Sequence, residues 1–352
     1  YNSALEVAVL LPSHLTSNSG IFIPDDALDV DSQTRSAGLY ATDTLSVTDQ
    51  LALTLSGRAN NTRTTINDPT GDNPALDGKH SFSRFNPAAG ITYQWTPALN
   101  FYGGYSESTR APTPVELTCA DPDAPCKLPN DFVSDPPLKQ VVAKGWEGGL
   151  RGVLGSGDRT NWHVGLFRTT NTDDILFQST GGTQSNEGFF ANVGDTRRQG
   201  LEASLSGTFF DKRLNWYANY TYLDATYLAS FSESSANHPD ANDEGLIFVK
   251  KGDRIPGLPK NSVKLGADFA ITRALSIGGD IVANSGQYLR ADEANLLGET
   301  AGYSVVNLRA NYTFNAHFSV FARVDNVFDR RYVTFGTLGD ASPDRLPLAA
   351  DL

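Results

Sequence analysis

Residues 51–60 read LALTLSGRAN, and apolar and polar side chains alternate along them. In an extended chain, successive side chains point to opposite faces, so Leu51, Leu53 and Leu55 share one face and Thr54 lies on the other. The stretch therefore predicts a β-strand with one apolar face and one polar face.

The same alternation recurs along most of the chain from about residue 35, and apolar residues recur at helical spacing almost nowhere. Most of these runs exceed the usual strand length of about 5 or 6 residues. They predict an all-β fold of about 12 strands, at 35–48, 50–65, 82–96, 98–110, 140–154, 159–178, 189–210, 213–229, 256–272, 274–290, 302–315 and 317–336.

Two kinds of connection alternate between these runs. Short turns are expected at 48–50, 96–98, 155–158, 211–213, 272–274 and 315–317. Long polar loops are expected at 66–82, 108–140, 180–188, 229–256 and 287–302. Long strands joined tightly at one end and loosely at the other predict an up-and-down antiparallel transmembrane β-barrel, whose strands alternate lipid-facing and lumen-facing residues.

Aromatic residues near the expected strand ends agree with this prediction, because interfacial girdles of aromatic side chains flank such barrels. The alternative is that aromatic residues are common in all strands. The residues concerned are Trp95, Phe101, Tyr105, Trp162, Trp216, Tyr217, Tyr312, Phe314, Phe318 and Phe328.

Composition excludes several classes of protein. The 352 residues carry a formal net charge of −12, which argues against a broad basic surface for nucleic acid. No apolar run approaches the roughly 20 residues of a transmembrane helix. The chain contains no methionine, so we expect it to be processed or a fragment.

The two cysteines, Cys119 and Cys126, lie close together in the longest expected loop. A pair without further Cys or His ligands favours a disulfide over a metal site, and two free thiols are the alternative. Such a staple can preorganise the loop for a ligand, or it can protect the loop from proteases.

Five stretches resemble, in chain order, the motifs of TonB-dependent outer-membrane receptors. They read GLYATDTLSVT (38–48), YGGYSESTRAPTPVEL (102–117), KGWEGGLR (144–151), RRQGLE (197–202) and RVDNVFDRRY (323–332). The motif positions to which we attach the resemblance are Arg110, Ala111, Pro112, Glu116, Leu117, Asn326, Phe328, Asp329 and Tyr332.

The resemblance implies a 22-stranded barrel with a plugged lumen, of which about 12 strands would be present here and the plug absent. Residues 1–34 would then hold a strand end and an extracellular loop, and 35–336 the barrel strands with their long loops. Residues 337–352 would begin the last extracellular loop, with the closing strand missing.

The resemblance also implies a function. A receptor of this family lies in the outer membrane of a Gram-negative bacterium as a monomer, and it imports a scarce large solute, most often a ferric siderophore. TonB supplies the energy through the plug, so neither a cofactor nor a catalytic site is expected. The alternatives are a passive channel and, less favoured, an outer-membrane barrel enzyme, for which no Ser/His or Asp/His constellation is evident.

Candidate contact residues fall into two groups. Expected ligand contacts at the loops are His80, Phe132, His238, Tyr288 and Arg290. The charged residues expected to face the lumen are Arg58, Glu147, Arg151, Glu202, Arg309 and Arg323, and also Asp268, Asp280 and Asp325. These charges can pair with a plug or steer an anionic chelate, but a wet barrel interior also carries charges that serve only structure and solvation.

Overall fold

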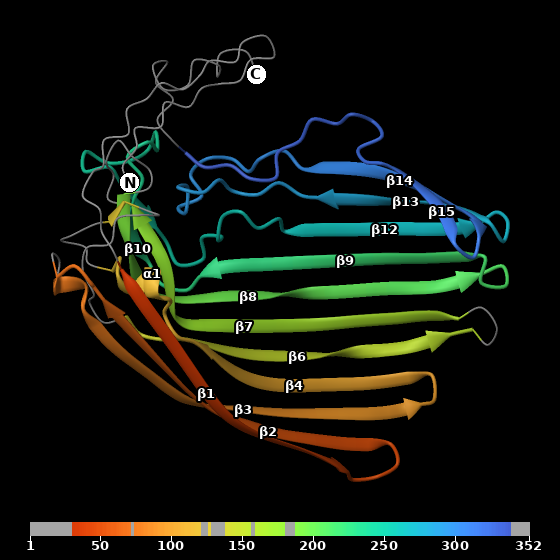
Figure 1. The fold of residues 1–352 in the computed structure, drawn as a ribbon, viewed down its shortest axis with the longest axis horizontal. Helices are drawn as coiled ribbons and strands as arrows, with labels where there is room; N and C mark the ends of the chain where they lie inside the picture. Colours follow the sequence, from red (N-terminus) through yellow and green to blue (C-terminus); the bar gives the residue numbers. More distant parts are fainter. Residues whose placement is uncertain are drawn as a thin grey trace.

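The computed structural model describes residues 30–71, 74–120, 126–127, 138–155, 159–179 and 187–338. Its strands belong to one antiparallel sheet, and Figure 1 shows the long ones side by side. Twelve of the described strands follow one another across it: β1 (Asp31–Ser46), β2 (Leu51–Asn67), β3 (Gly78–Thr96), β4 (Leu99–Arg110), β6 (Val141–Leu154), β7 (Thr160–Ser179), β8 (Glu187–Phe209), β9 (Leu214–Tyr227), β12 (Asn261–Ala270), β13 (Leu275–Asn284), β14 (Tyr303–Asn315) and β15 (Phe318–Val324). The predicted all-β, up-and-down arrangement is confirmed.

Some strand boundaries differ from the prediction. β12 begins at Asn261 rather than near residue 256, because Pro256 and Pro259 have no N–H to donate to a ladder. β13 ends at Asn284, where the N–H of Ser285 turns to the carbonyl of Asn261 at 2.9 Å. The chain therefore leaves the sheet earlier here than the apolar pattern suggests.

Side chains close several of the short turns. The hydroxyl of Thr48 accepts hydrogen bonds from the N–H groups two and three residues later, at 3.2 and 3.0 Å. Thr272 makes the same pair of bonds at 3.1 and 2.9 Å, and the amide oxygen of Asn315 makes them at 2.9 and 3.0 Å. These bonds satisfy N–H groups that the ladder cannot reach, so a few residues suffice to reverse the chain.

The sheet has one apolar and one polar face, as the alternation predicts. Residues paired across antiparallel strands point to the same side of the sheet. Following these pairs from strand to strand places Leu55, Leu166 and Ile277 on one face, which is the apolar one. Leu55 and Leu166 are 67% and 61% exposed, which is unfavourable in water. A transmembrane barrel presents such a face to lipid.

Aromatic rings gather where strands meet the short turns. Ring pairs flank three of these turns: Trp95 with Phe101, Phe209 with Trp216, and Phe314 with Phe318. Their centroids are 5.9, 5.8 and 5.3 Å apart. This placement matches an interfacial girdle at the end of the sheet that carries the short turns.

The opposite end carries the long loops, which contain further short elements: η1 (Pro74–Leu76), α1 (Pro114–Leu117), β5 (Cys126–Lys127), β10 (Phe231–Ser234) and β11 (Leu246–Val249). Two buried apolar groups lie there. The first loop cluster comprises Ile66, Leu117, Ala120, Leu138, Val141 and Ile175. The second loop cluster comprises Tyr227, Ile247, Val249 and Ala294. These buried clusters therefore lie at the loop end, where strand ends and loops meet, rather than along the length of the sheet.

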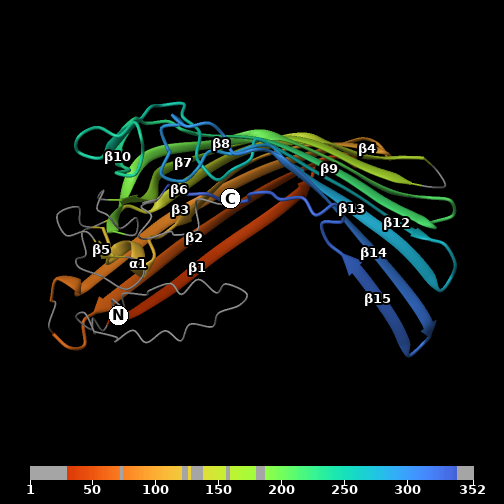
Figure 2. The same ribbon diagram turned by 90° about the horizontal axis from the view of Figure 1, so that it is seen from above.

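Figure 2 shows the sheet curved into an arc, with β1 and β15 at its two ends. Within the described ranges, each of these edge strands has a single neighbour in the sheet. None of the described helices is long and apolar enough to cross a membrane.

Candidate functional site

The charged residues selected from the sequence share one face of the sheet. Following paired residues from strand to strand places their side chains on the polar side. They are Arg58 on β2, Glu147 and Arg151 on β6, Glu202 on β8, Asp268 on β12, Asp280 on β13, Arg309 on β14 and Arg323 on β15. Their role toward a ligand stays a prediction.

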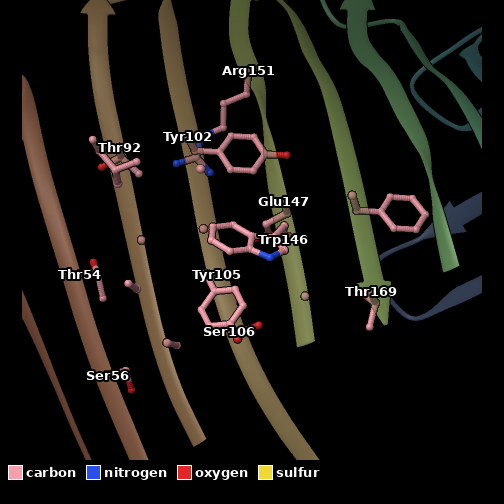
Figure 3. Close-up of a pocket in the computed structure, with 18 residues that line it drawn as sticks. Thr54, Ser56, Thr92, Tyr102, Tyr105, Ser106, Trp146, Glu147, Arg151 and Thr169 are labelled. Carbon is pink, nitrogen blue, oxygen red and sulfur yellow. The ribbon is translucent and has the colours of Figure 1, made fainter. Parts of the chain in front are cut away.

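Tyr102 on β4 organises the centre of this face. Its hydroxyl lies 2.6 Å from Nε2 of His163 on β7, so the side chain crosses over β6 to reach a strand two positions away. The guanidinium of Arg151 lies 5.7 Å from the ring centroid of Tyr102, and Figure 3 shows it beside that ring. Gly149 and Gly165 leave room for the hydroxyl, because an added Cβ would come within 2.8 and 2.6 Å of it.

A hollow of about 430 Å³ opens beside these side chains, lined by residues of β2, β3, β4, β6 and β7 (Figure 3). Glu147 and Arg151 give it one acidic and one basic group, and Thr54, Ser56 and Thr169 add hydroxyls. Such a surface can hydrogen-bond a polar, oxygen-rich solute. Tyr102 and His163 were not predicted as site residues, although the alternation along their strands places both on the polar face.

Gly149→Ala is expected to disturb this site, because the new Cβ would also lie 2.3 Å from the carbonyl oxygen of Val164. We expect a loss of about 1 to 3 kcal/mol in stability, as for other overpacked positions. Gly148→Ala is the matched control, since its nearest neighbour would be at an ordinary 3.5 Å. Urea unfolding in detergent checks this, and equal stability of the two variants would refute the steric reason.

Arg309 is the centre of an ion-pair network on the same face. Its guanidinium donates to both carboxylate oxygens of Asp268 at 2.7 and 2.6 Å and to Asp280 at 2.9 Å. Arg323 lies opposite Arg309 and pairs instead with Asp325 at 2.6 Å. Because these charges are already paired with one another, the geometry favours a structural role here over steering of a ligand.

The first motif region folds around Glu116. One oxygen of its carboxylate accepts from the guanidinium of Arg110 at 2.6 Å and from the N–H of Thr113 at 2.7 Å. Thr113 caps α1 in return, by accepting from the N–H of Glu116. Leu117 is fully buried in the first loop cluster. These motif residues therefore fix the start of the loop, with Ala111 and Pro112 between Arg110 and the cap.

The predicted disulfide between Cys119 and Cys126 is present. Backbone hydrogen bonds attach the stapled loop to the loop end of β8. Cys126 pairs with Gly188, and the carbonyl oxygen of Cys119 accepts from the N–H of Phe190. The staple thus lies at the loop end of β8, a strand that does not adjoin β4, from which the loop departs.

The second motif region ends the last described strand. β15 stops at Val324 rather than near residue 336, because Asn326 and Asp329 adopt left-handed conformations with φ of 51° and 46°. The side chain of Asn326 bonds both backbone groups of Arg330, at 2.9 and 3.0 Å. Tyr332 then stacks on Tyr303 at 4.6 Å, whereas Phe328 is 74% exposed.

His238, expected to contact a ligand, has a structural position instead. Its side chain is fully buried, and Nε2 lies 3.1 Å from Oδ1 of Asp292. Nδ1 accepts from the N–H of Asp240 at 3.0 Å. Both ring nitrogens are engaged within the protein, which argues for a structural position; contact with a ligand stays an untested prediction. A polar loop sequence does not reveal which of its side chains the fold buries.

The other expected contacts lie at different places among the loops. His80 stacks with Phe82 at 6.2 Å on β3, and Arg254 lies over the ring of Tyr288 at 5.8 Å. Arg290 is exposed beside a separate cavity at the loop end. Phe132 falls outside the described residues. The structure therefore does not unite these residues in one site.

Within the described ranges, no group of three or more His, Cys, Asp and Glu side chains is arranged to hold a metal ion.

Comparison with known proteins assigns the fold to a family. Residues 11–327 match the family model described as TonB dependent receptor-like, beta-barrel. The chain belongs to this family. The resemblance found in the sequence motifs is therefore confirmed, and the family is one of receptors rather than enzymes.

Individual relatives are distant and much longer. The ferric-pyoverdine M114 receptor PbuA of Pseudomonas sp. (strain M114) is 26% identical over 88% of this chain and 34% of its own length. The probable TonB-dependent siderophore receptor PiuA of Acinetobacter baumannii is 24% identical over 87% of this chain and 38% of its own length. The chain spans about a third of the length of these relatives.

Solved structures show the same fold at low identity. The crystal structure of the siderophore receptor PiuA from Acinetobacter baumannii superposes with a TM-score of 0.67 and 21% identity, covering 88% of this chain and 41% of that one. The copper transporter OprC also gives a TM-score of 0.67, with 18% identity, and covers 88% of this chain and 44% of its own.

Proposed function

We propose that this chain forms part of the barrel wall of a Gram-negative outer-membrane receptor that binds a ferric siderophore and imports it with energy delivered through TonB. The observation that carries the proposal is the family match over residues 11–327. Relatives named for ferric-pyoverdine and siderophore reception support iron chelates as the solute class.

Two features of the fold agree with this proposal. The polar face carries a hollow with hydroxyl, acidic and basic groups, which suits an oxygen-rich chelate passing along the interior. The described parts of the loop end are held by a disulfide and by two buried clusters, which supports a loop surface preorganised for a ligand.

Uptake of radioactive iron tests the proposal. In iron-starved cells, deletion of the gene is expected to reduce uptake of at least one ferric siderophore to background, and a strain lacking TonB is expected to show the same loss. Normal uptake of every chelate in the deletion strain would refute the iron assignment. Uptake that persists without TonB would instead favour a passive channel.

A further inference from the structure

Three basic residues gather at the loop end of β1, β2 and β3. Arg35 on β1 and Arg63 on β2 lie directly opposite each other in the antiparallel ladder. Lys79 on β3 is paired with Thr65, two residues beyond Arg63 on β2. All three basic side chains are exposed. These three residues form the basic patch.

The register determines the side of the sheet to which the basic patch points. Beside the Arg35–Arg63 pair, the hydroxyls of Thr34 and Thr64 lie 3.2 Å apart on the polar face. Successive side chains of a strand point to opposite faces, so Arg35 and Arg63 point to the apolar face. Leu55 is on that same face, since it lies an even number of residues from Arg63 on β2.

The basic patch lies where the apolar band of the sheet ends. On β1, Arg35 is ten residues from Leu45, which lies next to the short turn. Ten residues of strand extend about 33 Å, which is about 25 Å along the membrane normal at a tilt of about 40°. The apolar band of a transmembrane barrel is also about 25 Å tall. The patch is therefore at the level of lipid headgroups, and Leu39, which is 80% exposed, faces the acyl-chain region below it.

The positive charge of the patch is not compensated within the described residues, among which none of its three side chains forms an ion pair. The carboxylates on the same face of β1 are those of Asp31 and Asp43. They are four and eight residues from Arg35, about 13 and 26 Å along the strand. Like charges directly opposite each other destabilise a sheet, so an anion bound between the two guanidiniums would relieve their repulsion.

The arrangement of the patch favours a phosphate monoester as this anion. A guanidinium binds phosphate oxygens in a bidentate manner, and the Cβ atoms of opposite residues are only about 5 Å apart, so one phosphate can contact Arg35 and Arg63 together. Lys79 lies on the diagonal from Arg63, within reach of a long side chain. A monoester carries a charge of about −1.5 to −2 at neutral pH, which matches two guanidiniums better than the single charge of a diester.

We propose that the basic patch binds the phosphate monoester of a lipid headgroup in the leaflet on the loop side of the membrane. Arg35 and Arg63 hold the phosphate between them, Lys79 adds a third positive charge, and the acyl chains lie along the apolar face. Two observations support a lipid as the occupant: the charge of the patch and its continuity with the lipid-facing surface. The proposal rests on the membrane location contained in the proposed function, but not on the solute.

Native mass spectrometry of the protein at its full natural length, in a neutral detergent, tests the proposal with dioleoyl phosphatidic acid as the probe. Each basic residue near a membrane surface strengthens the binding of anionic lipid about fivefold. Arg35→Gln combined with Arg63→Gln is therefore expected to weaken binding about 25-fold, and Lys79→Gln about fivefold. Lys250→Gln combined with Lys251→Gln is the matched control, because these exposed lysines lie in the loop after β11 and the variant loses the same charge. Equal binding by the two double variants would overturn the proposal.

The choice of probe separates a lipid from other anions. Dioleoyl phosphatidylglycerol, a diester with one negative charge, is expected to bind more weakly than phosphatidic acid, and dioleoyl phosphatidylcholine more weakly still. Phosphatidic acid is expected to lose affinity as pH falls through about 6, where the monoester gives up its second charge. Inorganic phosphate that binds as tightly as phosphatidic acid would show a site for free anions and would overturn the assignment to a lipid.

Urea unfolding without added lipid separates lipid binding from a role within the protein. The Arg35→Gln, Arg63→Gln variant is expected to unfold at the same urea concentration as the unmodified protein or a higher one, because it loses a repulsion. A lower midpoint would mean that the two arginines hold the protein itself together, which contradicts the proposal.

Failure of this proposal can be distinguished from failure of the proposed function. If phosphatidic acid does not bind the patch while the protein still imports a ferric siderophore, the lipid site is wrong and the proposed function stands. If the lipid binds, and the double arginine variant loses it, while no iron chelate is ever imported, the lipid site stands and the iron assignment is wrong.

Discussion

Asp292→Ala is expected to destabilise the packing of the loops around the second loop cluster by about 3 to 5 kcal/mol. The Asp292 carboxylate is fully buried and accepts from Nε2 of His238 at 3.1 Å. It also accepts from the N–H groups of Leu296 and Leu297 at 2.8 and 3.0 Å. Alanine would leave the buried Nε2–H of His238 unpaired, at about 1 to 3 kcal/mol. It would also remove the acceptor of the two partly buried N–H groups.

Amide hydrogen exchange measures this effect locally. Protection is expected to fall at residues 235–242 and 292–297, the two segments that the His238–Asp292 contact joins, and to remain in the sheet. Asp243→Ala is the control, because Asp243 is an exposed aspartate in the same loop. Unchanged protection in Asp292→Ala would mean that the contact does not hold the loops together.

The sheet was predictable because its physical signal repeats. Alternation from Leu51 onward marks each strand wherever one side of the sheet is apolar, and a slip by one residue would expose every side chain to the wrong medium. The alternation does not predict where a strand begins or ends, because single residues determine those positions. Pro256 and Pro259 delay β12, and the left-handed Asn326 ends β15 within an aromatic-rich stretch that reads as strand.

The site was less predictable because it depends on contacts between distant parts of the chain. Tyr102 and His163 meet across 61 residues, and only the register and two glycines reveal that they can touch. His238 and Asp292 lie in segments whose composition is that of ordinary polar loops, and their burial follows from loop packing. Sequence reasoning could place charges on a face, but it could not tell which loop side chains would be enclosed.

Leu117→Ala is expected to cost about 2 to 5 kcal/mol, because Leu117 is fully buried in the first loop cluster and alanine would leave a cavity. The cluster joins α1 to β2, β6 and β7, so the loss should loosen the start of the stapled loop rather than the sheet. Val115→Ala is the matched control on the same helix, since Val115 is 42% exposed. Limited proteolysis of the protein in detergent should cleave the Leu117 variant faster within residues 111–140. Equal cleavage of the two variants would show that the disulfide alone holds the loop, because Cys119 and Cys126 are intact in both.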